Sequence, residues 1–350
     1  MTNSTHTYNQ RFIVTSIILS ILLLILIISN LLIGSVNIPA NEIFGMLSGE
    51  ECSNRVWEVI IFQSRIPTII TATLAGAALA VCGLLLQTVF NNPLADPSIL
   101  GISTGASLGV AVVMLLGGST LAGASSSYIA HLGSLSGAFI GAMAVLIMLI
   151  VFSSFVKSAT MLLIIGIMVS YLTSSAISLL NFFATEEGVH SFVIWGMGNF
   201  SSVSSDEISI FTIAIIISLI AALLMVKPLN ALLLGNRYAE NLGVNIKHTR
   251  NALLLITGLL TAVVTAYCGP ISFLGLVVPH IARLSLGTSN HNILTPITML
   301  AGAVMALLCS LCSVAHTTIG IIPINAITPI IGVPVIIYII LNRRKLQYFN

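Results

Sequence analysis

The stretch that decides the fold is residues 76–109, which read GAALAVCGLLLQTVFNNPLADPSILGISTGASLG. An apolar run enters this stretch and stops at Asn91-Asn92-Pro93, where two amide side chains meet a residue without a backbone N–H. Pro97 follows shortly afterwards, and the residue before each proline is disfavoured in helical geometry. We therefore expect a rigid, non-helical turn, whose structural residues are Asn92, Pro93, Asp96 and Pro97.

Glycines recur along the second apolar run with a spacing of four residues. They are Gly101, Gly105 and Gly109. Residues spaced in this way share one face of a helix, and glycines on that face let a neighbouring membrane helix approach closely. The stretch predicts two packed helices joined by the turn, although a plain hairpin between two spans would give the same pattern.

The composition of the chain is that of a membrane protein. Of its 350 residues, 57% are hydrophobic and only 6% are charged, whereas a soluble domain has about 25% charged residues. So few charges cannot cover a surface that faces water, and we expect an all-α polytopic protein embedded in a lipid bilayer, with no nucleic-acid partner. The first apolar run, 12–33, is long enough to cross a bilayer and lacks a cleavage site, so it is interpreted as a span and not as a signal peptide.

Counting apolar runs predicts about ten transmembrane helices, which form one domain over residues 1–350. The expected spans are 12–34, 59–90, 98–117, 128–153, 160–183, 207–226, 251–268, 272–287, 293–315 and 323–341. With the N-terminus in the cytoplasm, all of the 12 lysines and arginines except Arg55 and Arg65 fall inside, as the positive-inside rule requires. Both termini are therefore predicted to be cytoplasmic.

Two segments outside the membrane are long enough to carry function. The external loop 35–57 includes a short amphipathic helix near 38–44. The cytoplasmic loop 227–250 contains two short helical pieces punctuated by Gly235 and Gly243. A solvated loop is one interpretation, but it would leave apolar residues in water, so a docking surface for another protein is favoured. These residues are Leu232, Leu233, Leu234, Leu242 and Val244.

The sequence lacks residue patterns that are typical of ion coupling, ATP binding, catalysis and metal binding. No expected span has an acidic or basic residue at its centre, where ion-coupled transporters commonly need one. The chain has no G-x-x-x-x-G-K-[ST] motif and no catalytic constellation. Cys309 and Cys312 form a CxxC without a second ligand pair. We therefore expect no catalytic residue, no metal site and no cofactor on this chain.

The motifs resemble those of the FecCD family, the permease subunits of ABC importers for ferric siderophores, haem and vitamin B12. The resemblance covers nearly the whole chain. Its most specific strings are NNPLADP at 91–97 and GLVVPHIAR at 275–283, and Arg65-Ile66-Pro67 and Trp195-Gly196-Met197-Gly198 also match.

The resemblance implies the type II ABC importer permease fold in a bacterial cytoplasmic (inner) membrane. It implies that the subunit works as a pair, with a second copy of itself or a close paralogue. It also implies two ABC ATPase subunits docked on the cytoplasmic side and an external or periplasmic substrate-binding protein. ATP hydrolysis would then occur on a separate chain, so this chain would not be an enzyme.

Family roles carry over to three sets of residues. The ATPase-coupling loop would comprise Leu234, Gly235, Ala239, Leu242, Gly243 and Val244. The fifth span resembles the helix that lines the pathway, with Gly166, Ser170, Ser174 and Ser175 as candidates. The external docking candidates are Arg65, Arg55 and His316. This chain departs from the family pattern in having Thr68 and His316 at positions where arginine is common.

The expected function is therefore that of a permease for an iron chelate, either a ferric siderophore or haem. A cobalamin permease is the alternative within the family, because the motifs are shared. Two other classes stay open on the sequence: a self-sufficient secondary transporter or channel, and a structural subunit of a larger membrane complex.

Overall fold

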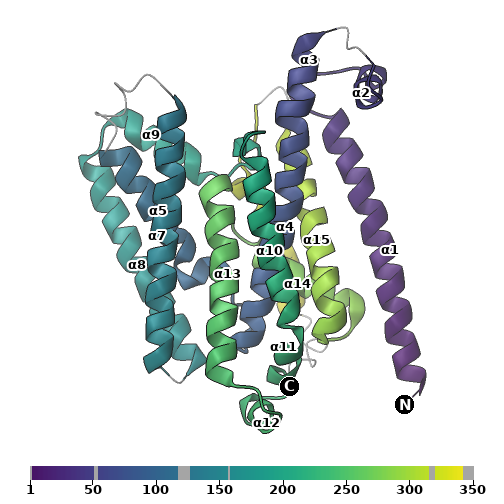
Figure 1. Ribbon diagram of the computed structural model, residues 1–350, viewed down its shortest axis with the longest axis vertical. Helices are drawn as coiled ribbons and strands as arrows, with labels where there is room; N and C mark the ends of the chain where they lie inside the picture. The colour runs from purple at the N-terminus through teal and green to yellow at the C-terminus, as the bar shows by residue number, and fades with distance from the viewer. Residues whose placement is uncertain (1, 51–53, 117–126, 157, 315–319, 342–350) are drawn as a thin grey trace.

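The computed structural model describes all residues except 1, 51–53, 117–126, 157, 315–319 and 342–350 (Figure 1). Within the described part the chain is helical and has no strand. The longer helices are α1 (Thr2–Leu32), α4 (Ile66–Val89), α7 (Ser127–Phe155), α8 (Ala159–Phe183), α10 (Ile208–Leu224), α13 (Ile246–Cys268), α14 (Leu274–Leu286), α15 (His291–Val314) and α16 (Ile324–Leu341). The shorter elements are α2 (Ala40–Leu47), α3 (Arg55–Val59), the π-helix η1 (Ile60–Arg65), the 3-10 helix η2 (Pro97–Leu100), α5 (Ile102–Ala111), the π-helix η3 (Val112–Leu116), α9 (Glu186–Gly196), the 3-10 helix η4 (Phe200–Ser202), α11 (Val226–Leu232) and α12 (Asn236–Asn241).

The polytopic all-α fold is confirmed. Among the described residues, the number of helices long enough to span a membrane is lower than the expected ten. In the described part, six helices are long and apolar enough to cross a membrane. A seventh span arises if α10 and α11, which meet at a bend of 48°, are taken together. The remaining expected spans correspond to three shorter apolar helices, Ile102–Leu115, Leu274–Leu286 and Ile324–Tyr338.

Helix α4 is the centre of the molecule. It contacts α10, α13, α14 and α15 and is buried along most of its length. Its small residues permit this, because a Cβ added to Gly76 would lie 2.3 Å from the carbonyl oxygen of Gly302 in α15. In lipid, where apolar surface gains nothing by leaving the solvent, such close backbone packing is a main source of helix association.

A second group of helices, α5, α7, α8 and α9, lies beside this centre, and α13 contacts both α4 and α7 (Figure 1). The predicted glycine face of 101–109 is confirmed for Gly105 and Gly109, which pack on α7. Gly101 instead caps α5 with a φ angle of 83°, and a Cβ there would meet Gly166 of α8. A Cβ on Gly109 would lie 1.9 Å from the carbonyl oxygen of Gly137, and a Cβ on Gly141 would lie 2.1 Å from that of Gly105. The α5 and α7 backbones are therefore in direct contact.

The two ends of the molecule carry different elements. Helices α2 and α3, from the loop 35–57, lie at one end, and α12, from the loop 227–250, lies at the other (Figure 1). The expected short helix near 38–44 is present as α2. The two long loops are thus separated by the full length of the helices, as the predicted topology requires.

Candidate functional site

The segment 234–242, which runs from the end of α11 through α12, presents an apolar tip at one end of the molecule. Leu234 and Leu242 are 62% and 59% exposed, and Tyr238 between them is 54% exposed. Gly235 and Gly243 flank α12 with φ angles of 95° and 82°, a left-handed backbone that favours glycine. The expected pair of helical pieces is confirmed as α11 and α12.

The six residues expected in the coupling loop do not share one role. Ala239 is buried and Val244 is half-buried, and the Val244 N–H donates to the Ala239 carbonyl oxygen at 3.0 Å. These two residues hold the loop in shape, and only the leucines supply exposed apolar surface. Leu232, one of the apolar residues assigned to the docking surface, is half-buried against a core cluster and adds little to the exposed tip. Tyr238 was missed, although its four-residue spacing from Leu234 and Leu242 could have identified it.

The four pathway candidates on α8 differ in their exposure. Gly166 is buried, and a Cβ there would lie 3.0 Å from the Leu100 Cα. Ser170 donates its hydroxyl to the Gly166 carbonyl oxygen at 3.0 Å. Ser174 and Ser175 are exposed. They lie among large exposed apolar side chains of the same helix, which are Met161, Ile164, Met168, Tyr171, Leu172, Leu179, Phe182 and Phe183.

The turn between α4 and α5 is closed by its own side chains. The Asn92 Oδ1 accepts a hydrogen bond from the Leu94 N–H at 3.0 Å. The Asp96 Oδ1 accepts from the Ser98 N–H at 2.9 Å and from the Ser98 hydroxyl at 2.5 Å, and Pro97 begins η2. Burial raises the pKa of the Asp96 carboxyl, and the hydrogen bonds from Ser98 oppose that rise. The predicted non-helical turn is confirmed.

The turn also packs against the start of α14, which sequence reasoning did not foresee. A Cβ on Gly275 would lie 2.8 Å from the Pro97 Cδ and 2.9 Å from the Asp96 Oδ2. Nearby, the Arg283 Nη1 donates to the Gln87 Oε1 at 2.5 Å. The 91–97 and 275–283 strings, far apart in the sequence, therefore form one contact.

The interpretation of Arg65 as an exposed docking residue is wrong. Its side chain is buried, at 7% exposure. The Arg65 Nη1 donates to the carbonyl oxygens of Leu31, at 2.5 Å, and Leu32, at 3.1 Å, and Nη2 donates to that of Val36. The last carbonyls of a helix have no partner within it, so this guanidinium satisfies the end of α1. Arg55 is exposed, and His316 lies outside the described residues.

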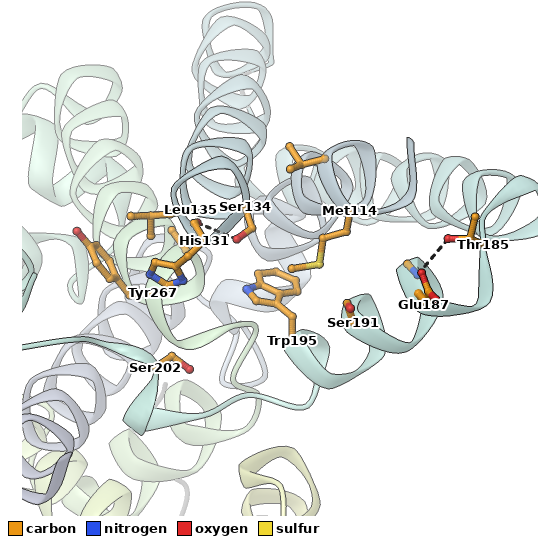
Figure 2. A pocket seen from close by; sticks show the side chains of 13 residues that line it. Met114, His131, Ser134, Leu135, Thr185, Glu187, Ser191, Trp195, Ser202 and Tyr267 are labelled. Atoms are coloured by element: carbon orange, nitrogen blue, oxygen red, sulfur yellow. Dashed lines mark hydrogen bonds between the residues drawn. The ribbon is translucent and has the colours of Figure 1, made fainter. Parts of the chain in front are cut away.

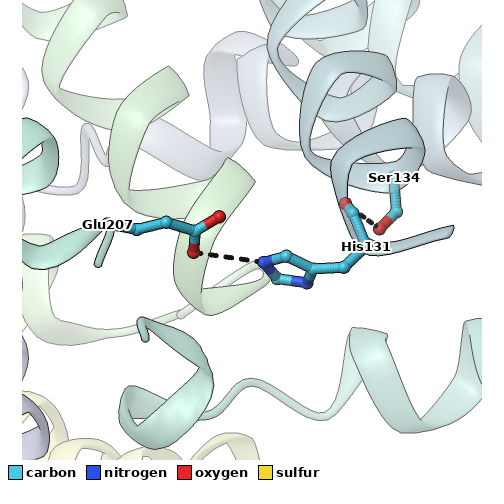
Figure 3. A network of polar contacts seen from close by, with 3 residues as sticks. All are labelled: His131, Ser134 and Glu207. Carbon is cyan, nitrogen blue, oxygen red and sulfur yellow. Dashed lines mark hydrogen bonds and ion pairs between the residues drawn. The ribbon is translucent and has the colours of Figure 1, made fainter. Parts of the chain in front are cut away.

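A cavity of about 410 Å³ lies between α7, α9 and α13 (Figure 2). Its lining includes His131, Glu187, Trp195 and Tyr267. The His131 Nε2 lies 3.2 Å from the Glu207 Oε2, which links α7 to the start of α10 (Figure 3). Sequence reasoning missed this pair, because its two residues are far apart and form no spacing motif.

Comparisons with known proteins agree on one family. The profile of the FecCD transport family matches residues 22–342. A hemin transport system permease protein of Yersinia pestis is 31% identical over 331 residues, covering 94% of this chain and 96% of the relative. A vitamin B12 import system permease protein of Salmonella paratyphi A is 34% identical over 288 residues, covering 82% and 85%.

The fold likewise matches a solved structure, described as an inward-facing conformation of a putative metal-chelate type ABC transporter. The TM-score is 0.79 at 31% sequence identity, over 93% of this chain and 97% of the other.

Proposed function

Because this chain belongs to the FecCD transport family and is a membrane permease subunit of an ABC importer, we propose that it forms the translocation pathway for an iron chelate, either a ferric siderophore or haem. The hemin permease of Yersinia pestis, similar over nearly the whole chain, supports this substrate class. Cobalamin is the second candidate, and the vitamin B12 permease of Salmonella supports it equally.

The observation that carries the proposal is the apolar tip formed by Leu234, Tyr238 and Leu242, which we name the coupling tip. Its side chains are apolar and exposed, and exposed apolar surface commonly marks a site of protein interaction. Burial in the groove of a partner protein would remove that surface from water. The proposed occupant is the groove of an ABC ATPase subunit on the cytoplasmic side. Closure of the two ATPases would move the tip, and the tip would move the helices.

A second copy of the chain, or a close paralogue, is proposed to cover the exposed face of α8. That face carries Ser174 and Ser175 among large apolar side chains, a combination that suits a pathway shared by two subunits. The binding protein would deliver the chelate at the end that carries Arg55. In this topology both termini lie in the cytoplasm of a bacterium, and the chain spans its inner membrane.

Uptake measurements test the proposal. A strain deleted for this chain would be supplied with labelled ferric siderophore, haem or cobalamin, with and without the restored chain. We expect restored uptake of an iron chelate. If only cobalamin uptake is restored, the substrate is cobalamin and not an iron chelate. Substrate flux through vesicles that contain this chain without an ATPase would overturn the proposed mechanism.

A further inference from the structure

Arg250, near the start of α13, joins that helix to the end of α7. Its side chain is buried, at 8% exposure. The Nη2 donates to the carbonyl oxygens of Ser153 at 2.5 Å and Val156 at 2.9 Å. The next residue, Asn251, accepts a hydrogen bond from the Ser153 hydroxyl at 2.7 Å. The start of α13 and the end of α7 are thus held together by three directional bonds.

This junction lies between the coupling loop and the connection from α7 to α8. On one side, Val244 ends the coupling loop and Asn245 caps α13 by accepting from the His248 N–H at 3.1 Å. On the other side, α7 ends at Phe155 and α8 begins at Ala159. Arg250 therefore stands between the loop proposed to contact the ATPases and the connection that leads into α8.

The chemistry of the junction suits the transmission of a displacement. The last carbonyls of α7 lack partners within the helix and carry partial negative charge. A guanidinium meets them with several donors in one rigid plane, and its removal would leave buried carbonyls unsatisfied. Apolar helix contacts permit small sliding motions, whereas these hydrogen bonds fix the two helix ends relative to each other.

We propose that Arg250 is a positioning residue for transport, which passes movement of the coupling loop to the α7–α8 connection and so to the exposed face of α8. The inference rests on the proposed function, in which ATPases act on the coupling loop. The test therefore measures the movement of α8 itself.

Arg65 provides a matched control. It is also a buried arginine that donates to carbonyl oxygens at a helix end, those of Leu31 and Leu32 in α1. It ends η1, which directly follows α3, and α3 lies at the end of the molecule opposite α12 (Figure 1). Replacing it by glutamine removes the same kind of bond without touching the path from the coupling loop to α8.

The experiment uses the assembled importer, with its ATPase subunits, in lipid nanodiscs. Spin labels attached at Ser174→Cys in both copies report the distance between the two α8 helices. The protein also carries Cys52→Ser and Cys312→Ser, so that the labels attach at position 174. ATP binding is expected to change this distance in the parent protein. In Arg250→Gln about tenfold fewer molecules should respond, the factor that one charge-assisted hydrogen bond contributes to an equilibrium. Arg250→Lys should restore part of the response, and Arg65→Gln should respond like the parent.

The outcomes separate the two claims. A parent protein that shows no ATP-driven change overturns the proposed function. A parent that responds, with Arg250→Gln responding equally, overturns the role of Arg250. An equal loss in Arg65→Gln also overturns that role, because the effect would then be general destabilisation. If Arg250→Gln does not assemble, Asn251→Ala, which removes the bond from the Ser153 hydroxyl, should weaken the response, and an unchanged response in it would count against the inference.

Discussion

Gly83 of α4 and Gly275 of α14 meet backbone to backbone: a Cβ placed on Gly83 would lie 1.7 Å from the Gly275 carbonyl oxygen. No side chain fits in that space. The short distance between α4 and α14 therefore requires glycine at both positions. The Asp96 carboxylate and the Pro97 ring approach Gly275 from another direction. This single point therefore joins α4, α14 and the turn that leads to α5.

Gly83→Ala is expected to destabilise the chain, because α14 must move away from α4 to admit a methyl group. Overpacking of this kind costs about 1–3 kcal/mol, and the thermal midpoint in detergent should fall accordingly. Gly196→Ala is the control, since a Cβ at Gly196 meets nothing within 4 Å and alanine favours a helix. An unchanged midpoint for Gly83→Ala would contradict the close contact.

Joint replacement of Leu234, Tyr238 and Leu242 by alanine should abolish uptake and leave the amount of folded chain unchanged. All three side chains are more than half exposed, so their loss leaves no cavity in the core. Uptake and ATPase activity of the assembled importer are the measurements. Ile213→Ala, on an exposed position of α10, should leave both unchanged. Normal uptake in the triple variant would rule out the coupling tip.

Some features of this fold have local signals in the sequence, and others depend on contacts between distant segments. The turn and the glycine faces were predictable, because their signals are local: prolines and glycines at fixed spacing restrict the backbone wherever they occur. The burial of Arg65 was not, because its partners are main-chain carbonyls 29 to 34 residues away, and every residue type carries a carbonyl.

The coupling loop and the contact between the 91–97 turn and α14 were also predictable only in part. The sequence marks Leu234 and Leu242 as apolar in a polar loop, but it does not show that Ala239 turns inward. Likewise, the 91–97 and 275–283 strings are recognisable separately, and only the fold shows that they touch. Contacts between distant segments depend on helix packing, which periodicity does not specify.

The two arginines near the loop 35–57 should respond differently to mutation. Arg65→Gln should lower the free energy of unfolding by roughly 1–3 kcal/mol, because buried carbonyls at the end of α1 lose their donor. Arg55→Glu should leave the thermal midpoint unchanged and weaken the binding protein's affinity only a few-fold, since an exposed ion pair contributes about 0–1 kcal/mol. Thermal melting and a binding titration on both variants are the measurements. A binding defect in Arg65→Gln without a stability defect would restore the docking role to Arg65.

Asp96 allows a test in which charge and hydrogen bonding are separated. Asp96→Ala removes the acceptor for the Ser98 N–H, the first bond of η2, and such a cap contributes about 0.5–2 kcal/mol. Asp96→Asn keeps an acceptor oxygen and removes the charge. We therefore expect the alanine variant to be less stable than the parent and the asparagine variant to be at least as stable.

The pH dependence gives the sign of the charge effect. Burial raises the pKa of the Asp96 carboxyl above its unfolded value of 3.8, so the folded protein binds this proton more tightly than the unfolded chain does. Stability contributed by the protonated form is then complete below that value and is lost as the pH rises through the folded pKa. Thermal midpoints measured from about pH 4 to about pH 7 should fall more for the parent than for Asp96→Asn. Parallel curves for the two proteins would mean that the carboxyl is ionised in the folded chain as readily as in the unfolded one.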